Sequence, residues 1–496
     1  MSPNKPLQKD ILEADLVVIG GGGAGLAAAV TAAGQGAGVI VLEKRSATGG
    51  NSALATGMFG AESPVQKRMG IEAGRDELFK LAMDYAHWRL DGKIVRAFID
   101  KSADTIRWFE EKGVVFDIVH HIGDHDVWHV PKNRCRDATD ALARDCKNLK
   151  VNILLRTSAK KILTGRDGKV TGVVAETKGE DFLIKAKSVF IGTGGYGGNK
   201  ELLKKYNSYY RENMRCTGAQ LQQGDGLLMA MEIGAATEGL GTLHWNGPEV
   251  HFPIIAEIHD PEHGIQKRRF RSLSEPDTLW VNKNGERFTN EALSNNRFQA
   301  INPVLRQPES ICYTIFDAAL LQMMIEEGLG NDTSRKKNRP AMKQFRVHGL
   351  EERLKAQDGK GHVKISGSWD VIARWMGADL QVLKATVDEY NTACDSGHDP
   401  LFAKDSEYLV PLRTAPYYAV KSFVGYVDTI GGIKINERME VISTQGKPVP
   451  GLYAGGIDTG GWEPETYNVL LSGSAVGFAF NSGRIAGENI VKYISG

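Results

Sequence analysis

The hydrophobic and polar positions near the start of the chain predict a strand, a tight turn and a helix. An apolar run at 15–19 (DLVVI) ends in the glycine-rich turn GGGGAG, and the Ala-rich segment LAAAVTAAGQG follows. A buried strand joined to an apolar helix by a short turn produces this order. A second apolar run at 38–44 (GVIVLEK) predicts the next strand, with an acidic residue near its end.

The rest of the chain continues this mixture of helices and strands. A helical period covers 76–113 and ends at Gly113, a residue type common just after helices. Residues 150–191 alternate between apolar and polar positions around the turn GRDGKV, which predicts antiparallel strands. A second portion with strands and helices lies at about 246–424. We therefore expect an α/β protein with more than one domain.

Composition narrows the possible partners. The chain has 496 residues, 42% of them hydrophobic and 24% charged, with a net charge of +1. This balance gives no electrostatic reason to expect a nucleic acid or an anionic membrane as partner, and the basic cluster KRRFR at 267–271 is interpreted as a solvated face. No apolar run is long enough to span a membrane, and we expect no signal peptide before the first strand.

Cysteine spacing narrows the chemistry further. The five cysteines are scattered and form no CxxC or CxxCH motif, so neither a zinc site, a covalent haem nor a redox disulfide is predicted. We expect a reduced, cytoplasmic protein. The histidines of HHIGDHDVWHV, namely His121, His125 and His129, have the spacing of a helical metal face, but Gly123 and the alternating VWHV argue against a helix. We predict no metal, and expect Trp128 and His129 in a pocket wall.

The first glycine-rich turn has the spacing of a dinucleotide site. Gly20 would permit the turn, Gly22 would let backbone approach a pyrophosphate, and Gly25 would let helix and strand pack closely. The helix N-terminus adds free N–H groups for phosphates. Glu43 ends the next strand, where a carboxylate can accept a hydrogen bond from a ribose hydroxyl.

The loop after Glu43 favours FAD over NAD. In KRSATGGNSALATGM, Gly49 and Gly50 would keep the loop close to a long ligand, while Asn51 and Ser52 offer polar side chains beside it. The alternative is a plain flexible loop. A second Gly-x-Gly-x-x-Gly begins at residue 192, but neither an Ala-rich helix nor a strand-end acid follows it. We interpret it as another segment along the same FAD rather than a separate NADPH domain.

Four segments together resemble the soluble fumarate reductase and 3-ketosteroid dehydrogenase superfamily of FAD enzymes. They are VVIGGGGAGLAAA, LEKRSATGGNSALATGM, IGTGGYGGN with QGDGLLMA, and GGIKIN…GKPVPGLYAGG…SGRIAG. The resemblance implies a Rossmann-type FAD-binding domain in two parts, 1–245 and 425–496, with an inserted α+β capping domain at 246–424. Membrane-bound relatives carry a flavin-linked histidine where this chain has Asn51, so non-covalent FAD is expected. Because the chain has no haem-attachment motif, an external electron donor or acceptor is expected as well.

The same resemblance, added to the glycine pattern, gives the predicted FAD-binding residues. They are Gly20, Gly22, Gly23, Ala24, Gly25, Glu43, Lys44, Gly49, Gly50, Asn51, Ser52, Thr56, Gly57, Ala159, Thr193, Gly194, Gly195, Asp225, Gly456, Ser472, Ser474 and Ala475.

The chain departs from fumarate reductases at their substrate-binding residues. Asn295 stands where the family has its proton-donating arginine, and Leu470 stands where it has a carboxylate-binding arginine. His244 matches a family substrate histidine, while Asp428 lies in VDTIGG, where the family has another histidine. Because a dicarboxylate needs charged, bidentate partners, a neutral and largely apolar small molecule is the expected substrate.

Tyrosines are the candidates for moving the proton. The family's 3-ketosteroid dehydrogenases use tyrosines, and their PFYA motif resembles APYYAVK, which implies Tyr418. Tyr467 lies in the loop expected at the flavin, and Tyr426 lies beside the flavin-side GG. Each of these could instead be a packed aromatic, and Arg297 could serve as the acid.

We thus expect an FAD-dependent oxidoreductase that reduces or forms a C=C bond conjugated to a carbonyl, as in a cyclic enone or 3-ketosteroid. One alternative is a carboxylate-directed ene-reductase that uses Arg297 or Arg413. Another is a flavoprotein subunit that only transfers electrons. The missing cysteine pair argues against a disulfide reductase. The oligomeric state stays open.

Overall fold

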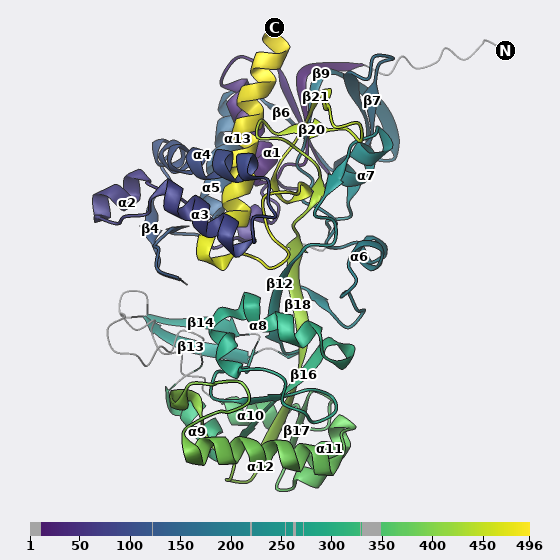
Figure 1. Ribbon diagram of the computed structural model, residues 1–496. Coiled ribbons are helices and arrows are strands. Elements are labelled where there is room, and N and C mark those ends of the chain that lie inside the picture. The colour runs from purple at the N-terminus through teal and green to yellow at the C-terminus, as the bar shows by residue number, and fades with distance from the viewer. Residues whose placement is uncertain are drawn as a thin grey trace, which may run out of the picture. The chain divides into compact units, whose positions relative to one another are not determined.

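The computed structural model describes residues 11–496 apart from 122, 219–220, 253, 261–263, 271, 328 and 330–348. The chain forms two compact units (Figure 1). The first contains the described residues up to Ser208 together with Cys216–His244 and Val427–Gly496, and the second contains Tyr209–Arg215 and Trp245–Tyr426. The domain boundaries expected at 245/246 and 424/425 lie beside these divisions.

An eight-stranded sheet forms the centre of the first unit. Its parallel strands lie in the order β21 (Pro448–Ala454), β9 (Glu180–Ile191), β1 (Leu12–Ile19), β2 (Val39–Glu43) and β6 (Asn152–Leu155). Antiparallel strands complete the sheet: β20 (Glu440–Ile442), β7 (Thr157–Thr164) and β8 (Val170–Thr177). The predicted α/β, Rossmann-type fold and the antiparallel strands around GRDGKV are confirmed.

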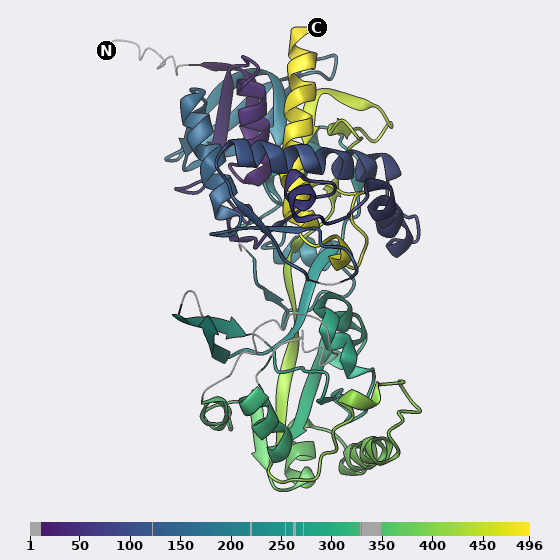
Figure 2. The same cartoon turned by 90° about the vertical axis from the view of Figure 1, so that its left-hand side faces the viewer.

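Two helices from opposite ends of the chain pack together on this sheet. They are α1 (Gly23–Ala33) and α13 (Ser474–Ser495), which lie side by side in both views (Figures 1 and 2). The approach depends on two glycines of α13, since a Cβ on Gly483 would lie 2.2 Å from the Ala24 carbonyl oxygen and one on Gly487 would lie 2.9 Å from that of Ala28. Part of the glycine-rich carboxyl end therefore serves helix packing.

The remaining elements of the first unit surround the sheet. The helical period at 76–113 is two helices, α3 (Arg75–Tyr85) and α4 (Gly92–Glu111), because Asp91 caps α4 by accepting from the N–H groups of Lys93 and Ile94. The other elements are α2 (Pro64–Met69), α5 (Arg136–Asn148), α6 (Lys200–Tyr206), α7 (Asp225–Glu232), β3 (Met58–Phe59), β4 (Phe116–Ile118), β5 (Trp128–Pro131), β11 (Thr237–Glu238) and β19 (Gly432–Ile433).

The second unit is built on another sheet. The order is β10 (Arg215–Cys216), β18 (Tyr417–Thr429), β16 (Ile311–Asp317) and β15 (Leu279–Val281), with β12 (Leu243–Glu249) and β17 (Val363–Ser366) also on β18. Strands β12 and β18 carry the chain from one unit to the other. The other elements are the hairpin β13 (Ile254–Asp260) and β14 (Gly264–Phe270) and the helices α8 (Arg297–Leu305), α9 (Ala318–Glu327), α10 (Leu350–Lys355), α11 (Trp369–Met376) and α12 (Leu380–Ser396).

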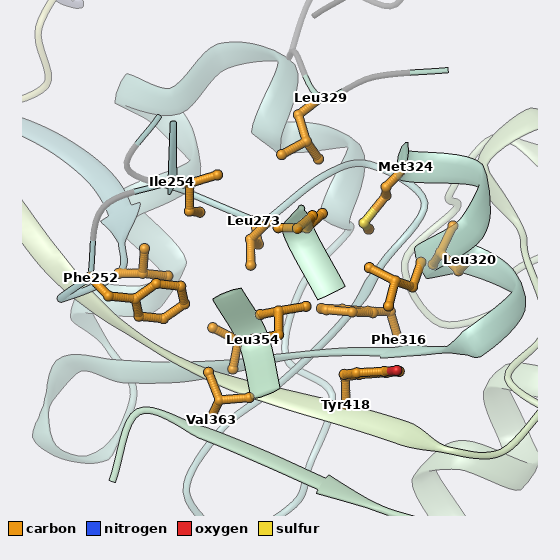
Figure 3. Packing of buried hydrophobic residues seen from close by; sticks show 14 residues of the cluster. Phe252, Ile254, Leu273, Phe316, Leu320, Met324, Leu329, Leu354, Val363 and Tyr418 are labelled. Carbon is orange, nitrogen blue, oxygen red and sulfur yellow. The ribbon is translucent and has the colours of Figure 1, made fainter. Parts of the chain in front are cut away.

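Both faces of this second sheet are buried. Phe316 and Tyr418 point to one core, shown in Figure 3, while their neighbours Ile315 and Ala419 point to a second core on the opposite face. Such alternation follows from the two-residue period of a strand. Within the described part of the chain, no helix combines the length and the apolar character needed to cross a membrane.

Candidate active site

The glycines of the first turn have three different physical roles. Gly20 has φ +103°, and a Cβ there would lie 2.3 Å from the Gly192 carbonyl oxygen. A Cβ on Gly25 would lie 1.9 Å from the Gly20 carbonyl oxygen, so only glycine allows α1 to start this close to β1. By contrast, a Cβ on Gly22 would meet no described atom within 4 Å. Gly22 thus faces open space at the N-terminus of α1, where a phosphate can bind.

Glu43 is held in a defined orientation at the end of β2. It is buried, and its two carboxylate oxygens accept from the N–H groups of Gly21 at 2.9 Å and Arg45 at 2.8 Å. Each oxygen keeps a second lone pair, so the predicted hydrogen bond to a ribose hydroxyl stays compatible with this geometry.

A cavity of about 460 Å³ lies beside Glu43. Its wall includes Ala159 from β7, Thr193 after β9, and the ion pair between Lys44 Nζ and Asp225 Oδ2 at 2.7 Å. All of these are among the residues predicted from the sequence. Ser158, Lys160, Leu228, Met229 and Glu232 also line the cavity and were missed, because no local pattern distinguishes them within their strand or helix.

A second cavity, of about 100 Å³, lies beside the first. The two share the lining residues Gly20, Glu43, Lys44 and Thr193, so they are neighbours along the turn. The wall of the second cavity includes the predicted residues Gly22, Gly23, Ala24, Gly50, Asn51, Ser52, Gly194 and Gly456. Two neighbouring cavities, one of them lined by Gly22 and Gly23 at the N-terminus of α1, suit a dinucleotide whose pyrophosphate lies at that helix end.

Eight predicted cofactor residues line neither cavity. Gly25 packs against β1, Gly49 donates its N–H to the Gly21 carbonyl at 2.8 Å, and a Cβ on Gly57 would lie 2.6 Å from the His129 carbonyl oxygen. Gly195 donates its N–H to Asp458 at 2.7 Å. Thr56, Ser472, Ser474 and Ala475 complete the set, and the last two begin α13. For the three glycines and Gly195, the structure gives a packing or hydrogen-bonding role.

Asp458 is a structural residue that the sequence did not reveal. It is buried and accepts from the N–H groups of Gly194 and Gly195, both at 2.7 Å, and from Thr193 Oγ1 at 3.0 Å. Burial raises the pKa of its carboxyl group, and these donors oppose that rise. These hydrogen bonds connect the loop after β9 to the segment near the C-terminus that carries Asp458.

In the first unit, the predicted residues Tyr467 and His244 lie together. Their rings stack with centroids 4.0 Å apart and planes 17° apart. His244 Nδ1 lies 3.3 Å from Asp428 Oδ1. The Tyr467 hydroxyl accepts from the Ala475 N–H, at 3.5 Å, in the first turn of α13. Burial raises the pKa of Tyr467 above its ordinary value, and the nearby Glu463 adds to this effect.

In the second unit, Tyr418 and Tyr426 are both buried. Tyr418 stacks on Phe316, with centroids 5.2 Å apart, inside the core of Figure 3. Tyr426 packs edge-to-face on Trp245 and Tyr210. The placement of Tyr418 matches a packed core aromatic, so our proposal for proton transfer rests on Tyr467.

A buried ionic network holds the segment that carries Asn295 and Arg297. Asn295 lies on the 3-10 helix η2 (Glu291–Asn296), and Arg297 begins α8. At the start of η2, Glu291 accepts from Arg287 at 2.8 Å and lies 3.1 Å from Lys404 Nζ. Arg287 also donates to Asp399 at 2.8 Å. Two positive and two negative groups thus balance in the interior of the second unit.

The histidines of the HHIGDHDVWHV segment serve separate contacts. His129 is fully buried and bonds to Ser63 Oγ at 2.6 Å and to the Val127 carbonyl at 3.0 Å. The expectation that His129 forms a pocket wall is therefore wrong. Burial lowers the pKa of His129 to about 4, so it is neutral at physiological pH. His121 instead bonds through Nδ1 to Ser472 Oγ at 3.0 Å.

Comparisons with known proteins agree with this geometry. A family model described as an FAD-binding domain matches residues 15–466. The vinyl phenol reductase of Lactiplantibacillus plantarum is 31% identical over 488 residues, which cover 97% of this chain and 96% of that protein.

Two solved structures share the fold. A flavocytochrome c3 fumarate reductase in an open conformation is 27% identical, with a TM-score of 0.71 over 97% of this chain and 79% of its own. A 3-ketosteroid-delta4-(5alpha)-dehydrogenase from Rhodococcus jostii, at 21% identity, has a TM-score of 0.72 over 98% of both chains and supports the fold alone. The resemblance seen in the sequence is confirmed.

Proposed function

The chain belongs to the FAD-binding domain family, and we propose that it reduces, or forms, a C=C bond in a neutral, largely apolar substrate, with Tyr467 moving the proton. That it is an FAD-dependent oxidoreductase acting on C=C bonds follows from the family and the related reductases. The charge of the substrate and the role of Tyr467 are the proposal.

The observation that carries the proposal is the acidic surroundings of His244 and Tyr467. Asp428 lies 3.3 Å from His244, and Glu463 lies close enough to Tyr467 to raise its pKa. A substrate carboxylate placed here would be repelled by Asp428, and burying it without a cationic partner would be costly. A neutral substrate meets neither penalty.

The related vinyl phenol reductase supports a neutral substrate. When a proton adds to the terminal carbon of a vinyl phenol and the phenol loses its own proton, a quinone methide forms. Its exocyclic C=C bond is conjugated to a carbonyl, so it accepts a hydride at the benzylic carbon in the same way as an enone. Vinyl phenols and cyclic enones therefore belong to one substrate class for this site.

Bound FAD supplies the hydride or accepts it, and the residues of the chain handle the proton. A tyrosine hydroxyl is protonated at neutral pH even at its ordinary pKa, and burial raises the pKa of Tyr467 further, so its proton is present for donation. After it donates, the Ala475 N–H at the start of α13 favours the phenolate. Stacking on His244 holds the Tyr467 ring in position. Asn51 lines the smaller cavity and offers no nucleophile, so we propose that FAD is bound without a covalent link.

Equilibrium binding tests the charge argument. Flavin absorbance is followed while the oxidised protein is titrated with para-vinyl phenol, a steroid enone, fumarate and a cinnamate. We expect the neutral compounds to perturb the flavin and the carboxylates to bind poorly. Asp428→Asn should strengthen carboxylate binding by about tenfold, because one nearby charge is worth at least about 1 kcal/mol. Asp167→Asn, in an exposed turn, is the matched control. Tight fumarate binding by the wild type would favour the alternative based on Arg297.

A further inference from the structure

We propose that Gln222 is a further FAD-binding residue, whose side-chain amide forms a hydrogen bond with a hydroxyl group of the FAD ribityl chain. No sequence motif indicated Gln222, which lies directly before the segment QGDGLLMA and outside both glycine motifs. This role requires bound FAD, which the family establishes. It does not depend on the charge of the substrate or on Tyr467.

The backbone around Gln222 is held in place by hydrogen bonds. The Gln222 carbonyl oxygen accepts from the Gly198 N–H at 2.8 Å, and the Gly224 N–H donates to the Gly195 carbonyl oxygen at 3.0 Å. These two bonds join residues 222–224 to the loop after β9, which Asp458 anchors in turn. The Gln222 side chain therefore starts from a fixed position in the cavity wall.

The Gln222 side chain is a buried polar group that lines the smaller cavity. Only 7% of the residue is exposed. Its amide oxygen Oε1 is buried and accepts no hydrogen bond from any residue that the structure describes. Because burying an amide without a hydrogen-bond partner costs free energy, we expect a partner from outside the chain to bind here.

The second Gly-x-Gly-x-x-Gly motif leaves the space that this amide occupies. A Cβ on Gly194 would lie 2.9 Å from Gln222 Nε2, so an alanine at this position would displace the amide. A Cβ on Gly197 would lie 3.4 Å from Gln222 Oε1, which is an ordinary contact distance. The amide thus packs along this motif, which the sequence analysis interpreted as a segment along FAD.

The lining of the two cavities indicates which part of FAD would meet Gln222. Glu43, the predicted ribose ligand, lines both cavities, whereas Gln222, Gly455 and Gly456 line only the smaller one. With the pyrophosphate at the N-terminus of α1, the adenosine would occupy the larger cavity and the ribityl chain would enter the smaller one. A ribityl hydroxyl both donates and accepts, so it can pair with either end of the amide.

The first test measures FAD affinity and the stability of the flavin-free protein in parallel. Gln222→Met removes the amide and keeps a side chain of similar length, so FAD binding, followed by quenching of FAD fluorescence, should weaken roughly tenfold. The melting temperature of the flavin-free protein should stay the same or rise, because a buried polar group without a partner has been removed. Gln223→Met, at the exposed neighbouring position, is the matched control and should change neither quantity. A lower melting temperature with unchanged FAD affinity would show that Gln222 only supports the fold.

A second measurement identifies the group of FAD that Gln222 binds. The flavin-free protein is titrated with FAD analogues that each lack one ribityl hydroxyl. One analogue should bind the wild type about tenfold more weakly than FAD does, yet bind Gln222→Met as tightly as FAD does, because that variant has already lost the hydrogen bond. If every analogue loses the same factor with both proteins, Gln222 does not bind the ribityl chain and the assignment is overturned. Unchanged turnover in Tyr467→Phe would instead overturn the proposed function and leave these binding results as they are.

Discussion

Tyr467 is the residue on which the proposed chemistry depends. Its hydroxyl is buried, accepts from the first turn of α13, and lies on a ring that His244 holds by stacking. These contacts keep a proton donor in one orientation and stabilise the anion left behind.

Replacing Tyr467 by Phe should therefore lower turnover by roughly 10²- to 10³-fold while leaving FAD bound, because only the hydroxyl is removed. Steady-state rates and the ratio of flavin to protein absorbance measure both effects. Tyr453→Phe, another buried tyrosine of the first unit, should keep near wild-type activity. Tyr418→Phe is informative as well: the family resemblance predicts a large loss of turnover, whereas the position of Tyr418 in the core shown in Figure 3 predicts little loss.

The glycines of the first turn give a second prediction at this scale. Gly22→Ala should leave the stability of the flavin-free protein unchanged and weaken FAD binding, because its Cβ meets only open space at the helix N-terminus. Gly25→Ala should instead prevent folding, since its Cβ would lie 1.9 Å from a backbone oxygen. The melting temperature of the flavin-free protein measures the effect on stability, and quenching of FAD fluorescence measures the effect on FAD binding. Equal loss of stability in both variants would contradict the roles assigned here.

At the scale of elements, the network of Arg287, Glu291, Asp399 and Lys404 fixes η2 and the start of α8. Lys404 also donates to the Thr278 carbonyl at 3.1 Å and to the Tyr390 hydroxyl at 3.0 Å, so one fully buried side chain joins several segments. Removing it would leave a net negative charge in the interior.

Lys404→Met should accordingly destabilise the protein by about 3–5 kcal/mol. The exposed pair Lys355–Glu351, at 2.7 Å within α10, provides the control. Lys355→Met should leave the free energy of unfolding nearly unchanged, because solvent screens that pair. Urea unfolding of the two variants measures the difference. A cost for Lys404→Met close to that of the control would show that the network contributes little.

At the scale of the whole molecule, the sequence predicted the features that are determined by residues close together along the chain. Local spacing predicted the strand, turn and helix around Gly20 to Gly25 and the place of Glu43 at a strand end, and the structure has both. The two-part domain with an insertion was expected from the family resemblance. Asp458 was missed because its hydrogen bonds reach back more than 260 residues along the chain. For Tyr418 the sequence left a packed aromatic and a substrate role both open, because both faces of β18 are buried and alternation along the strand does not distinguish a core from a substrate-facing side.

The central claim is that the reduced enzyme transfers hydride to a neutral C=C substrate. Anaerobic reoxidation tests it most directly: the purified protein is reduced, and flavin absorbance is followed after adding para-vinyl phenol, a steroid enone, fumarate or a cinnamate at equal concentration. The account predicts that at least one neutral compound reoxidises the flavin roughly a hundredfold faster than either carboxylate. Rapid reoxidation by fumarate alone would contradict the argument from Asp428, Asn295 and Leu470.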